Sequence, residues 1–332
     1  MPVESRIATT INQFIRGSDH PDLQVYRRDM ASMDFRLWEW RIRHFCDLGH
    51  FYGKTILEVG CGFGWDAVGL ALIGGNRVIA SDILPSMVDG VSQCLESMRK
   101  KGRELPITPM QGDICALDLP DNSLDGIFST EAIEHVHDLP KMFAECFRLL
   151  RPGGTAVIVN DSNRFNNDSR EHSWGSWADR DDSWKHTEWL KSNVRPVEHR
   201  NAKPYGVMRE ELIRAIAPDF SSDVISNLRK ATAGMIRTEI ETAVRQFRQD
   251  GSLPTPDPYA WCRNPETGEY SERLLDPFEL RDLLKRVGFR VRLRHLFRKM
   301  PFRLANSIAF KPVNLRLFSM RPHFVLVAYK AR

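Results

Sequence analysis

The stretch "ILEVGCGFGWDA" (56–67) constrains the fold of this chain more than any other. An apolar run typical of a buried strand leads into three glycines at alternate positions, and the helical pattern of 65–75 follows. A second apolar run at 77–83 completes the succession of strand, glycine loop, helix and strand. Such a unit almost always closes right-handed into a parallel sheet. The stretch therefore predicts an α/β fold.

The same alternation continues along the chain. The further elements that we expect are helices over 85–101, 139–150 and 276–289, strands over 106–113, 123–130, 155–160, 289–297 and 323–330, and a turn at 151–154. The run 323–330 is apolar throughout, so it should lie inside the sheet, whereas 289–297 alternates. The predicted fold class is α/β, with a Rossmann-like, doubly wound, mostly parallel seven-stranded sheet and a largely helical insert.

Three parts follow from this pattern. Residues 51–160 together with 276–332 should form the Rossmann-like core, because strands and helices alternate there. Residues 161–275 break the rhythm and are predicted to be an inserted cap that binds substrate. Residues 1–50 contain one amphipathic helix, expected over 29–47, and are predicted to form a helical lid.

Composition narrows the class of protein. The six cysteines form no C-x-x-C pair, which argues against a zinc site and a disulfide framework and favours a reducing cytoplasm. No apolar run has the length of a signal peptide or a membrane span, so we expect a soluble, cytoplasmic protein.

The charge is uneven. The formal net charge is +4, yet residues 276–332 hold 14 Lys and Arg against 3 Asp and Glu. The basic segment 292–322 has four interpretations: a solvated face, contact with an anionic substrate, weak attachment to an acidic membrane surface, or phosphate contacts to a nucleic acid.

Acidic residues follow the strands next to the glycine loop. Asp82 ends the second strand and Asp113 the third, so both should share one crevice with the loop at the carboxyl edge of the sheet. A carboxylate in the place of Asp82 can accept the hydroxyls of a ribose. A dinucleotide is disfavoured, because the third glycine of its motif would fall at Trp65. The alternative is an ordinary tight turn from strand to helix.

Together these motifs resemble the class I S-adenosylmethionine-dependent methyltransferases, in particular their UbiE-like small-molecule branch. "ILEVGCGFG" resembles the first motif, "VIASDI" the ribose-binding acidic motif, and "QGDI" the adenine-side motif. "LDLPDNSLDGIFSTEAIEHVHDLPKMFAECFRLLRPGGTAVI" resembles the long central signature. The resemblance covers about 54–160 and 276–332, and implies S-adenosylmethionine as the cofactor.

The resemblance also implies roles for single residues. The glycine loop would pass along the methionine part of the cofactor, Asp82 would hold the ribose, and Asp113 would recognise the adenine edge. Cys61 departs from the pattern, and we expect its thiol to be packed and inert. The residues implied for cofactor binding are Glu58, Gly60, Cys61, Gly62, Gly64, Asp82, Ile83, Asp113, Ile114, Thr130 and Glu131.

His135, in "EAIEHV" just after the fourth strand, is the candidate catalytic residue. Methyl transfer needs in-line alignment, and a hydroxyl or ammonium nucleophile also needs a base, for which histidine is the usual choice. The alternative is that His135 only packs over the cofactor or caps its helix.

The start of the cap is rich in aromatic residues. Its tryptophans would form a cation box or a stacking wall, or else the core of the cap itself, which is the more common arrangement. No metal is expected, because the histidines lack metal-ligand spacing. The candidate substrate-binding residues are Asn160, Asp161, His172, Trp174 and His186.

The function predicted is methyl transfer from S-adenosylmethionine to a small or medium-sized acceptor: a natural product, a sugar or a lipid-linked compound. O- or N-methylation is favoured. One alternative is a nucleic-acid (RNA) methyltransferase, which we do not favour because the chain lacks [DN]-P-P-[YFW] after the fourth strand and a Pro-Cys nucleophile. Another is a binding module for the cofactor without catalysis. The oligomeric state has no signature in the sequence.

Overall fold

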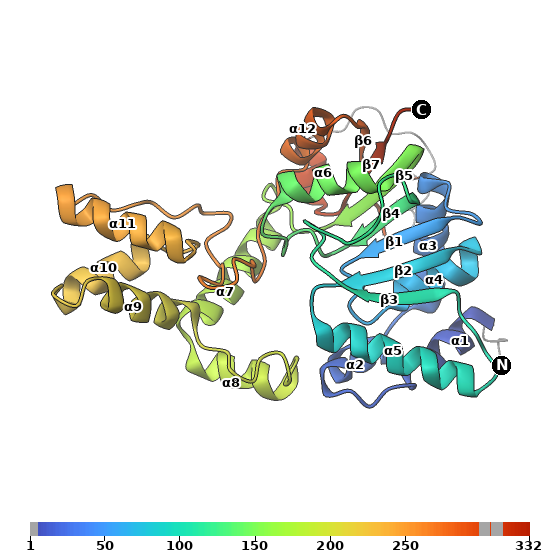
Figure 1. Cartoon of the computed structure of the whole chain (residues 1–332), viewed down its shortest axis with the longest axis horizontal. Helices are drawn as coiled ribbons and strands as arrows, with labels where there is room; N and C mark the ends of the chain where they lie inside the picture. The colour runs from blue at the N-terminus through green and yellow to red at the C-terminus, as the bar shows by residue number, and fades with distance from the viewer. Residues whose placement is uncertain (1–5, 299–305, 307–314) are drawn as a thin grey trace.

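A seven-stranded sheet in the order β3-β2-β1-β4-β5-β7-β6 forms the centre of the protein (Figure 1). The computed structural model describes residues 6–298, 306 and 315–332. The strands β1 to β5 run parallel, and β7 pairs antiparallel with β5 and β6. The strands are β1 (Thr55–Val59), β2 (Arg77–Asp82), β3 (Ile107–Gln111), β4 (Leu124–Thr130), β5 (Leu150–Asn160), β6 (Arg290–His295) and β7 (Phe324–Tyr329).

Helices cover both faces of this sheet. Neighbouring strand residues such as Ile56 and Leu57 enter two different hydrophobic clusters, because side chains alternate between the faces of a strand. One cluster includes α1, α3, α4 and α5, and the other includes α6 and α12. The helices and the 3-10 helix η1 around the sheet are α1 (Arg6–Ile15), η1 (Pro21–Leu23), α2 (Gln24–Ala31), α3 (Phe35–Gly49), α4 (Trp65–Gly74), α5 (Pro85–Lys100), α6 (Leu139–Leu149), α12 (Pro277–Val287) and α13 (Leu315–Met320).

The predicted α/β class, the mostly parallel seven-stranded sheet and the interior position of 323–330 are confirmed. The single helix expected over 29–47 is wrong. Helix α2 ends at Ala31, and a separate helix, α3, begins at Phe35. It begins there because the Asp34 side chain accepts hydrogen bonds from the backbone N–H groups of Arg36 and Leu37 (3.0 and 3.1 Å). The turn expected at 151–154 lies inside β5, where the pairing with β4 shifts its register.

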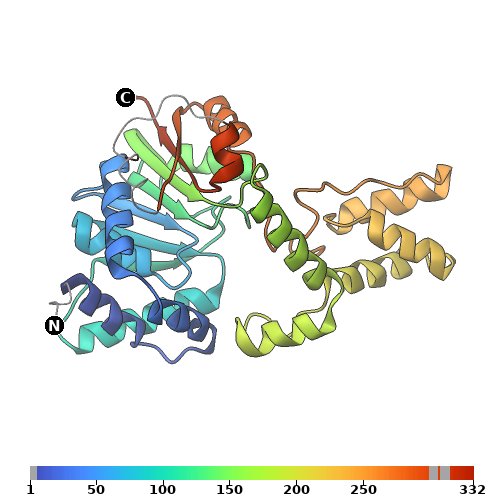
Figure 2. The ribbon, with the colours of Figure 1, turned by 180° about the vertical axis from the view of Figure 1, so that it is seen from behind.

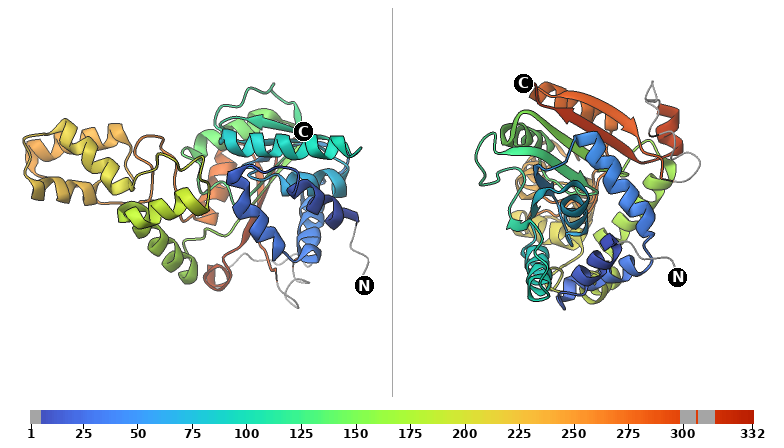
Figure 3. Two further views of the ribbon diagram at one scale, coloured as in Figure 1. Left: turned by 90° about the horizontal axis from the view of Figure 1, so that it is seen from below. Right: turned by 90° about the vertical axis from the view of Figure 1, so that its right-hand side faces the viewer.

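The insert (residues 161–275) is largely helical and extends away from the sheet (Figures 2 and 3). Its last three helices enclose a small apolar core of their own, which includes Ile213, Leu228 and Ile240. The helices of the insert are α7 (Asn167–Asp182), α8 (Trp184–Asn193), α9 (Tyr205–Ile216), α10 (Ser222–Ala231) and α11 (Arg237–Asp250).

Four tryptophans at the start of the insert, between residues 174 and 189, differ in part from the expectation that they form its core. Trp177 is fully buried, but the side chains of Trp174, Trp184 and Trp189 are 39%, 50% and 52% exposed. The core expectation is therefore wrong for three of the four. Trp189 lines the cavity described below, and the indole N–H of Trp174 donates to the carbonyl oxygen of Pro258 (2.8 Å).

Part of the basic segment 292–322 can be described. Residues 299–305 and 307–314 lie outside the described residues. On the edge strand β6, Arg290 and Arg292 point to the exposed side, and the Arg292 guanidinium lies 5.5 Å from the ring centroid of Tyr329.

Within the described ranges, no helix combines the length and the apolar character needed to cross a bilayer.

Candidate functional site

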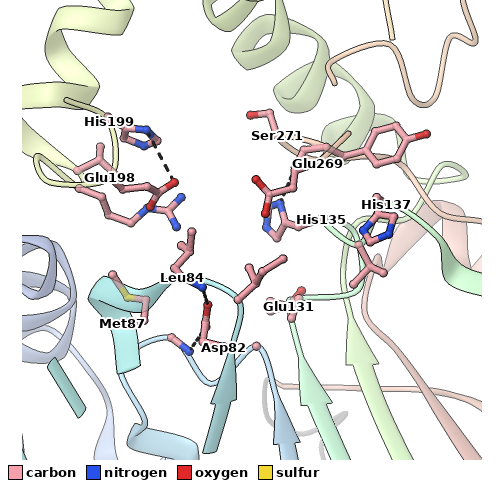
Figure 4. Close-up of a pocket in the computed structure, with 18 of the residues that line it drawn as sticks. Asp82, Leu84, Met87, Glu131, His135, His137, Glu198, His199, Glu269 and Ser271 are labelled. Carbon is pink, nitrogen blue, oxygen red and sulfur yellow. Dashed lines mark hydrogen bonds and ion pairs between the residues drawn. The ribbon is translucent and has the colours of Figure 1, made fainter. Parts of the chain in front are cut away.

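A cavity of about 440 Å³ lies between the carboxyl edge of the sheet and the insert (Figure 4). The ends of β1, β2 and β4 form its floor, and α7, α8 and the loop that returns from the insert form its walls. The volume falls in the range of small-molecule sites. Its position agrees with the rule that open α/β sheets bind ligands beyond the carboxyl ends of their strands.

The glycine loop brings bare backbone to the cavity floor. Gly60 and Gly62 both have positive φ (+67° and +48°) and line the cavity. A Cβ on Gly60 would lie 2.4 Å from the Cβ of Ala132, so no larger residue fits there. A Cβ on Gly62 would meet only the Tyr26 hydroxyl, at 3.8 Å, so the space beside it is open. Gly64 caps α4 and does not line the cavity.

Asp82 is held in place by this loop. Its Oδ2 accepts the N–H of Gly62 (2.8 Å) and its Oδ1 accepts the N–H of Leu84 (3.0 Å), as Figure 4 shows. The residue is 8% exposed, and burial raises the pKa of its carboxyl group while the two N–H donors oppose that shift. Each oxygen keeps a further lone pair. The carboxylate is thus a fixed acceptor for two hydroxyl groups.

The next strand adds Asp113 to the cavity wall. Its Oδ1 accepts the N–H of Cys115 (2.9 Å), and its Oδ2 lies 3.8 Å from Nε2 of His137. Ile83 and Ile114 line the cavity beside it. A planar ring between these apolar side chains would present its edge to the carboxylate.

Besides Gly64, three of the predicted cofactor residues do not line the cavity: Glu58, Cys61 and Thr130. Glu58 is 2% exposed, and burial raises the pKa of its carboxyl group well above the usual range. Cys61 is 5% exposed, so its thiol is packed as expected, and burial raises the pKa of this thiol well above its usual range.

Glu131 lines the cavity and belongs to a polar network beneath it. Its backbone has a positive φ of 46°, and its carboxylate accepts the N–H of Asp161 (3.0 Å) and pairs with Arg298 (3.1 Å). Asp161 in turn lies 3.2 Å from His323. Burial raises the pKa of Glu131. Asp161, predicted on the substrate side, therefore supports the floor from below.

His135 is oriented by the insert. Its Nδ1 lies 3.1 Å from the carbonyl oxygen of Tyr270, and since a carbonyl only accepts, Nδ1 must carry the hydrogen. In the neutral ring, Nε2 is then the atom that can accept a proton. The nearest carboxylate oxygen, on Glu134, is 3.9 Å from Nε2. The side chain is 50% exposed, and it lines the cavity.

The loop between α8 and α9 closes the opposite side of the cavity. Arg195 and Glu198 line the cavity and form an ion pair (2.9 Å). Asp22 of η1, which is fully buried, accepts the N–H groups of Val197 (2.8 Å) and Glu198 (3.3 Å). The N-terminal region and the insert thus meet beside the cavity.

The structure brings only some of the predicted substrate residues to the cavity. His186 lines it, whereas Asn160, Asp161, His172 and Trp174 do not. Asn160 is fully buried and its amide donates to Glu134 (2.6 Å). Sequence reasoning missed the cavity-lining residues Arg180, Arg195, Glu198, His199, Glu269 and Tyr270. They come from separate turns of the insert and share no spacing that could have identified them.

Two sets of side chains among the described residues bring potential metal-ligand atoms within 4.8 Å of one another. In the first, Cys115 has a thiol pKa raised to about 12, mainly by burial, which disfavours the thiolate that a metal needs. In the second, Glu131 is already paired with Arg298. The two sets are Asp113, Cys115 and His137, and Glu131, Asp161 and His323.

Comparison with known proteins agrees with this geometry. Residues 57–158 match the family described as "Methyltransferase domain". A protein of Mycolicibacterium smegmatis named "Probable S-adenosylmethionine-dependent methyltransferase" is 34% identical over 125 residues, 38% of this chain and 42% of the relative. The sterol 24-C-methyltransferase of Aspergillus fumigatus is 28% identical over 122 residues, 36% of this chain and 32% of the relative.

Solved structures resemble the chain over a greater length. A SAM-dependent methyltransferase from Aquifex aeolicus aligns over 93% of this chain and 99% of its own, with 14% identity and a TM-score of 0.44. The two sequence relatives are matched over less than half of their own length. The matched family covers the glycine loop, Asp82, Asp113 and His135, and it ends before the insert.

Proposed function

We propose that the protein is a class I S-adenosylmethionine-dependent methyltransferase that transfers a methyl group to a small or medium-sized acceptor in the cavity. The match of residues 57–158 to the family described as "Methyltransferase domain" supports this proposal. The observation that carries this proposal is the Asp82 carboxylate, fixed by the N–H groups of Gly62 and Leu84 at the edge of the cavity. It offers acceptors for the two hydroxyls of a ribose.

The cavity fits S-adenosylmethionine. Gly60 and Gly62 leave space for the methionine part against bare backbone, and Asp113 offers an acceptor at the adenine end. When bound, the cofactor supplies an electrophilic methyl group on a positively charged sulfur. The role of the surrounding residues is to align the acceptor and to exclude water.

His135 is the proposed general base. Its Nδ1 donates to the Tyr270 carbonyl, so Nε2 is the nitrogen that can accept a proton when the ring is neutral. If Nε2 of His135 took a proton from a hydroxyl or an ammonium group of the methyl acceptor, that group would become nucleophilic. This role favours O- or N-methylation, although the sterol relative is named for methylation of carbon.

The position of the cavity between the sheet edge and the insert favours a small molecule over a nucleic acid as the acceptor. An acceptor between the sheet edge and the insert would be a natural product, a sugar or the head of a lipid-linked compound. His186 and Trp189 both line the cavity from α8 and stack on each other (ring centroids 5.8 Å apart), so they offer an aromatic surface. We also propose that the protein is located in the cytoplasm.

The test is transfer of label from S-adenosyl-L-[methyl-³H]methionine. The purified protein is incubated with this donor and the small-molecule fraction of a cell extract, and in parallel with bulk RNA. Label in a small molecule supports the proposal, and Asp82→Ala serves as the negative control. Donor binding without transfer would instead support a binding module, and label in RNA alone would support a nucleic-acid methyltransferase.

A further inference from the structure

Arg180, near the end of α7, is a buried cation in the cavity wall. It is 7% exposed, yet it lines the cavity. Its guanidinium lies 4.2 Å from the ring centroid of Tyr205, and its Nη1 lies 3.4 Å from the carbonyl oxygen of Lys203. Within the described residues, no carboxylate forms an ion pair with it.

The acidic residues that follow Arg180 in α7, and Glu198 in the loop after α8, are engaged elsewhere. Asp181 accepts two hydrogen bonds from Arg209 (2.7 and 2.8 Å), and Asp182 pairs with Arg229 (2.7 Å). In the loop after α8, on the same wall as Arg180, Glu198 pairs with Arg195 (2.9 Å). These acidic side chains therefore each have another arginine as partner.

An uncompensated charge in a buried position is costly, because the desolvated cation has no counter-ion. His199, on the same wall, illustrates how burial and nearby positive charge disfavour a second cation there. Burial and the charges of Arg195 and Arg180 lower the pKa of His199 to about 4. The ring is thus neutral near pH 7, and Arg180 is left as the unmatched charge of this wall.

The proposed base, His135, lies on the opposite side of the cavity from this wall. In Figure 4, Glu198 and His199 lie on one side of the cavity. Glu269 and His135 lie on the other. A molecule that spans the cavity would present one end to His135 and the other to the wall that holds Arg180.

We propose that the methyl acceptor carries an anionic group, a carboxylate or a phosphate, that binds Arg180 while its nucleophilic atom faces His135. This inference rests on the proposed methyl transfer. The planar guanidinium presents parallel N–H donors that match both anions, and pairing would supply the counter-ion that the protein leaves out. The aromatic pair His186 and Trp189 would pack against the body of the same acceptor.

The test uses the full chain saturated with S-adenosylhomocysteine and three probes of similar shape: benzoate, phenyl phosphate and benzamide. Calorimetry should show at least one anion binding ten or more times tighter than neutral benzamide. Arg180→Gln should remove that preference, and Arg180→Lys should retain part of it. The control is Arg214→Gln, since Arg214 is a half-exposed arginine on α9 paired with Glu210, and it should match the wild type.

The outcomes separate the two proposals. Failure of the wild type to bind S-adenosylhomocysteine refutes the proposed function itself. Normal binding of S-adenosylhomocysteine with equal affinity for benzamide and both anions overturns the anionic acceptor, and so does an anion preference that survives in Arg180→Gln. If Arg180→Gln does not fold, the affinities of the wild type for the two anions and for benzamide still test the anionic acceptor. The tighter anion distinguishes a carboxylate acceptor from a phosphate acceptor.

Discussion

The two sides of the cavity are built in different ways. On the sheet side, backbone atoms of the glycine loop and the Asp82 carboxylate, which two N–H groups hold in place, lie in the turns that follow parallel strands. On the insert side, the cavity is lined by long side chains such as Arg180, Arg195 and Trp189, from α7, α8 and the loop after it. The first side depends on backbone geometry and the second on the charge and shape of side chains.

This difference explains how one fold can keep a donor and change its acceptor. A turn that needs positive φ at Gly60 and Gly62 tolerates few substitutions, so the sheet side resists change. The helices α9 to α11 of the insert have an apolar core that is separate from the two clusters beside the sheet. Function on this fold is therefore expected to diverge through the insert.

His135 joins the two sides, so its replacement should have the largest effect. His135→Gln removes the proposed base, and we expect kcat to fall by about 10²- to 10⁴-fold. Binding of S-adenosylhomocysteine should change less than about twofold, because the sheet side is intact. Single-turnover label transfer and calorimetry give the two numbers. Turnover equal to the wild type at saturating acceptor would exclude His135 from catalysis.

Damage within the insert should leave donor binding intact. Asp181→Ala strands the guanidinium of Arg209, which is 1% exposed, and breaking such a buried pair costs about 3–5 kcal/mol. We expect urea denaturation to show early unfolding of the insert, with donor affinity close to that of the wild type. Asp219→Ala, which removes an exposed pair with Arg248, is the control and should unfold like the wild type. Loss of donor binding in Asp181→Ala would show that the two sides are not separable.

The insert side should also respond to pH. Because the pKa of His199 is lowered to about 4 from about 6.5, its neutral form is favoured in the folded state. The contribution of His199 to stability is complete above pH 6.5 and is lost as the pH falls toward 4. Relative to His199→Gln, the wild type should therefore lose about 2 kcal/mol of unfolding free energy between pH 7.5 and pH 5. A difference in unfolding free energy between the wild type and His199→Gln that stays constant from pH 7.5 to pH 5 would contradict the lowered pKa of His199.

The sheet side could be predicted from sequence because its signals are local. The spacing of Gly60, Gly62 and Gly64 behind an apolar run predicts the loop, and continuous apolarity predicts the interior position of 323–330. The break before α3 was missed because the apolar pattern continues across it. Only the capping bonds of Asp34 reveal the boundary.

The insert side could not be predicted in the same way. Arg180 and Glu269 are 89 positions apart in the sequence and meet at one cavity only through the packing of the insert. A buried arginine has no periodic pattern, and the partners of Asp181 and Asp182 emerge only in three dimensions. The exposed rings of Trp184 and Trp189 likewise have no signature in the sequence.

The central claim is that Asp82 and the glycine loop hold the donor. The most direct measurement is calorimetric titration of the wild type and of Asp82→Ala with S-adenosylhomocysteine. We expect one site per chain in the wild type and at least tenfold weaker binding in the variant, about 1.4 kcal/mol, because the ribose loses a buried partner. Equal affinity in the two proteins, or no binding by the wild type, would contradict the account.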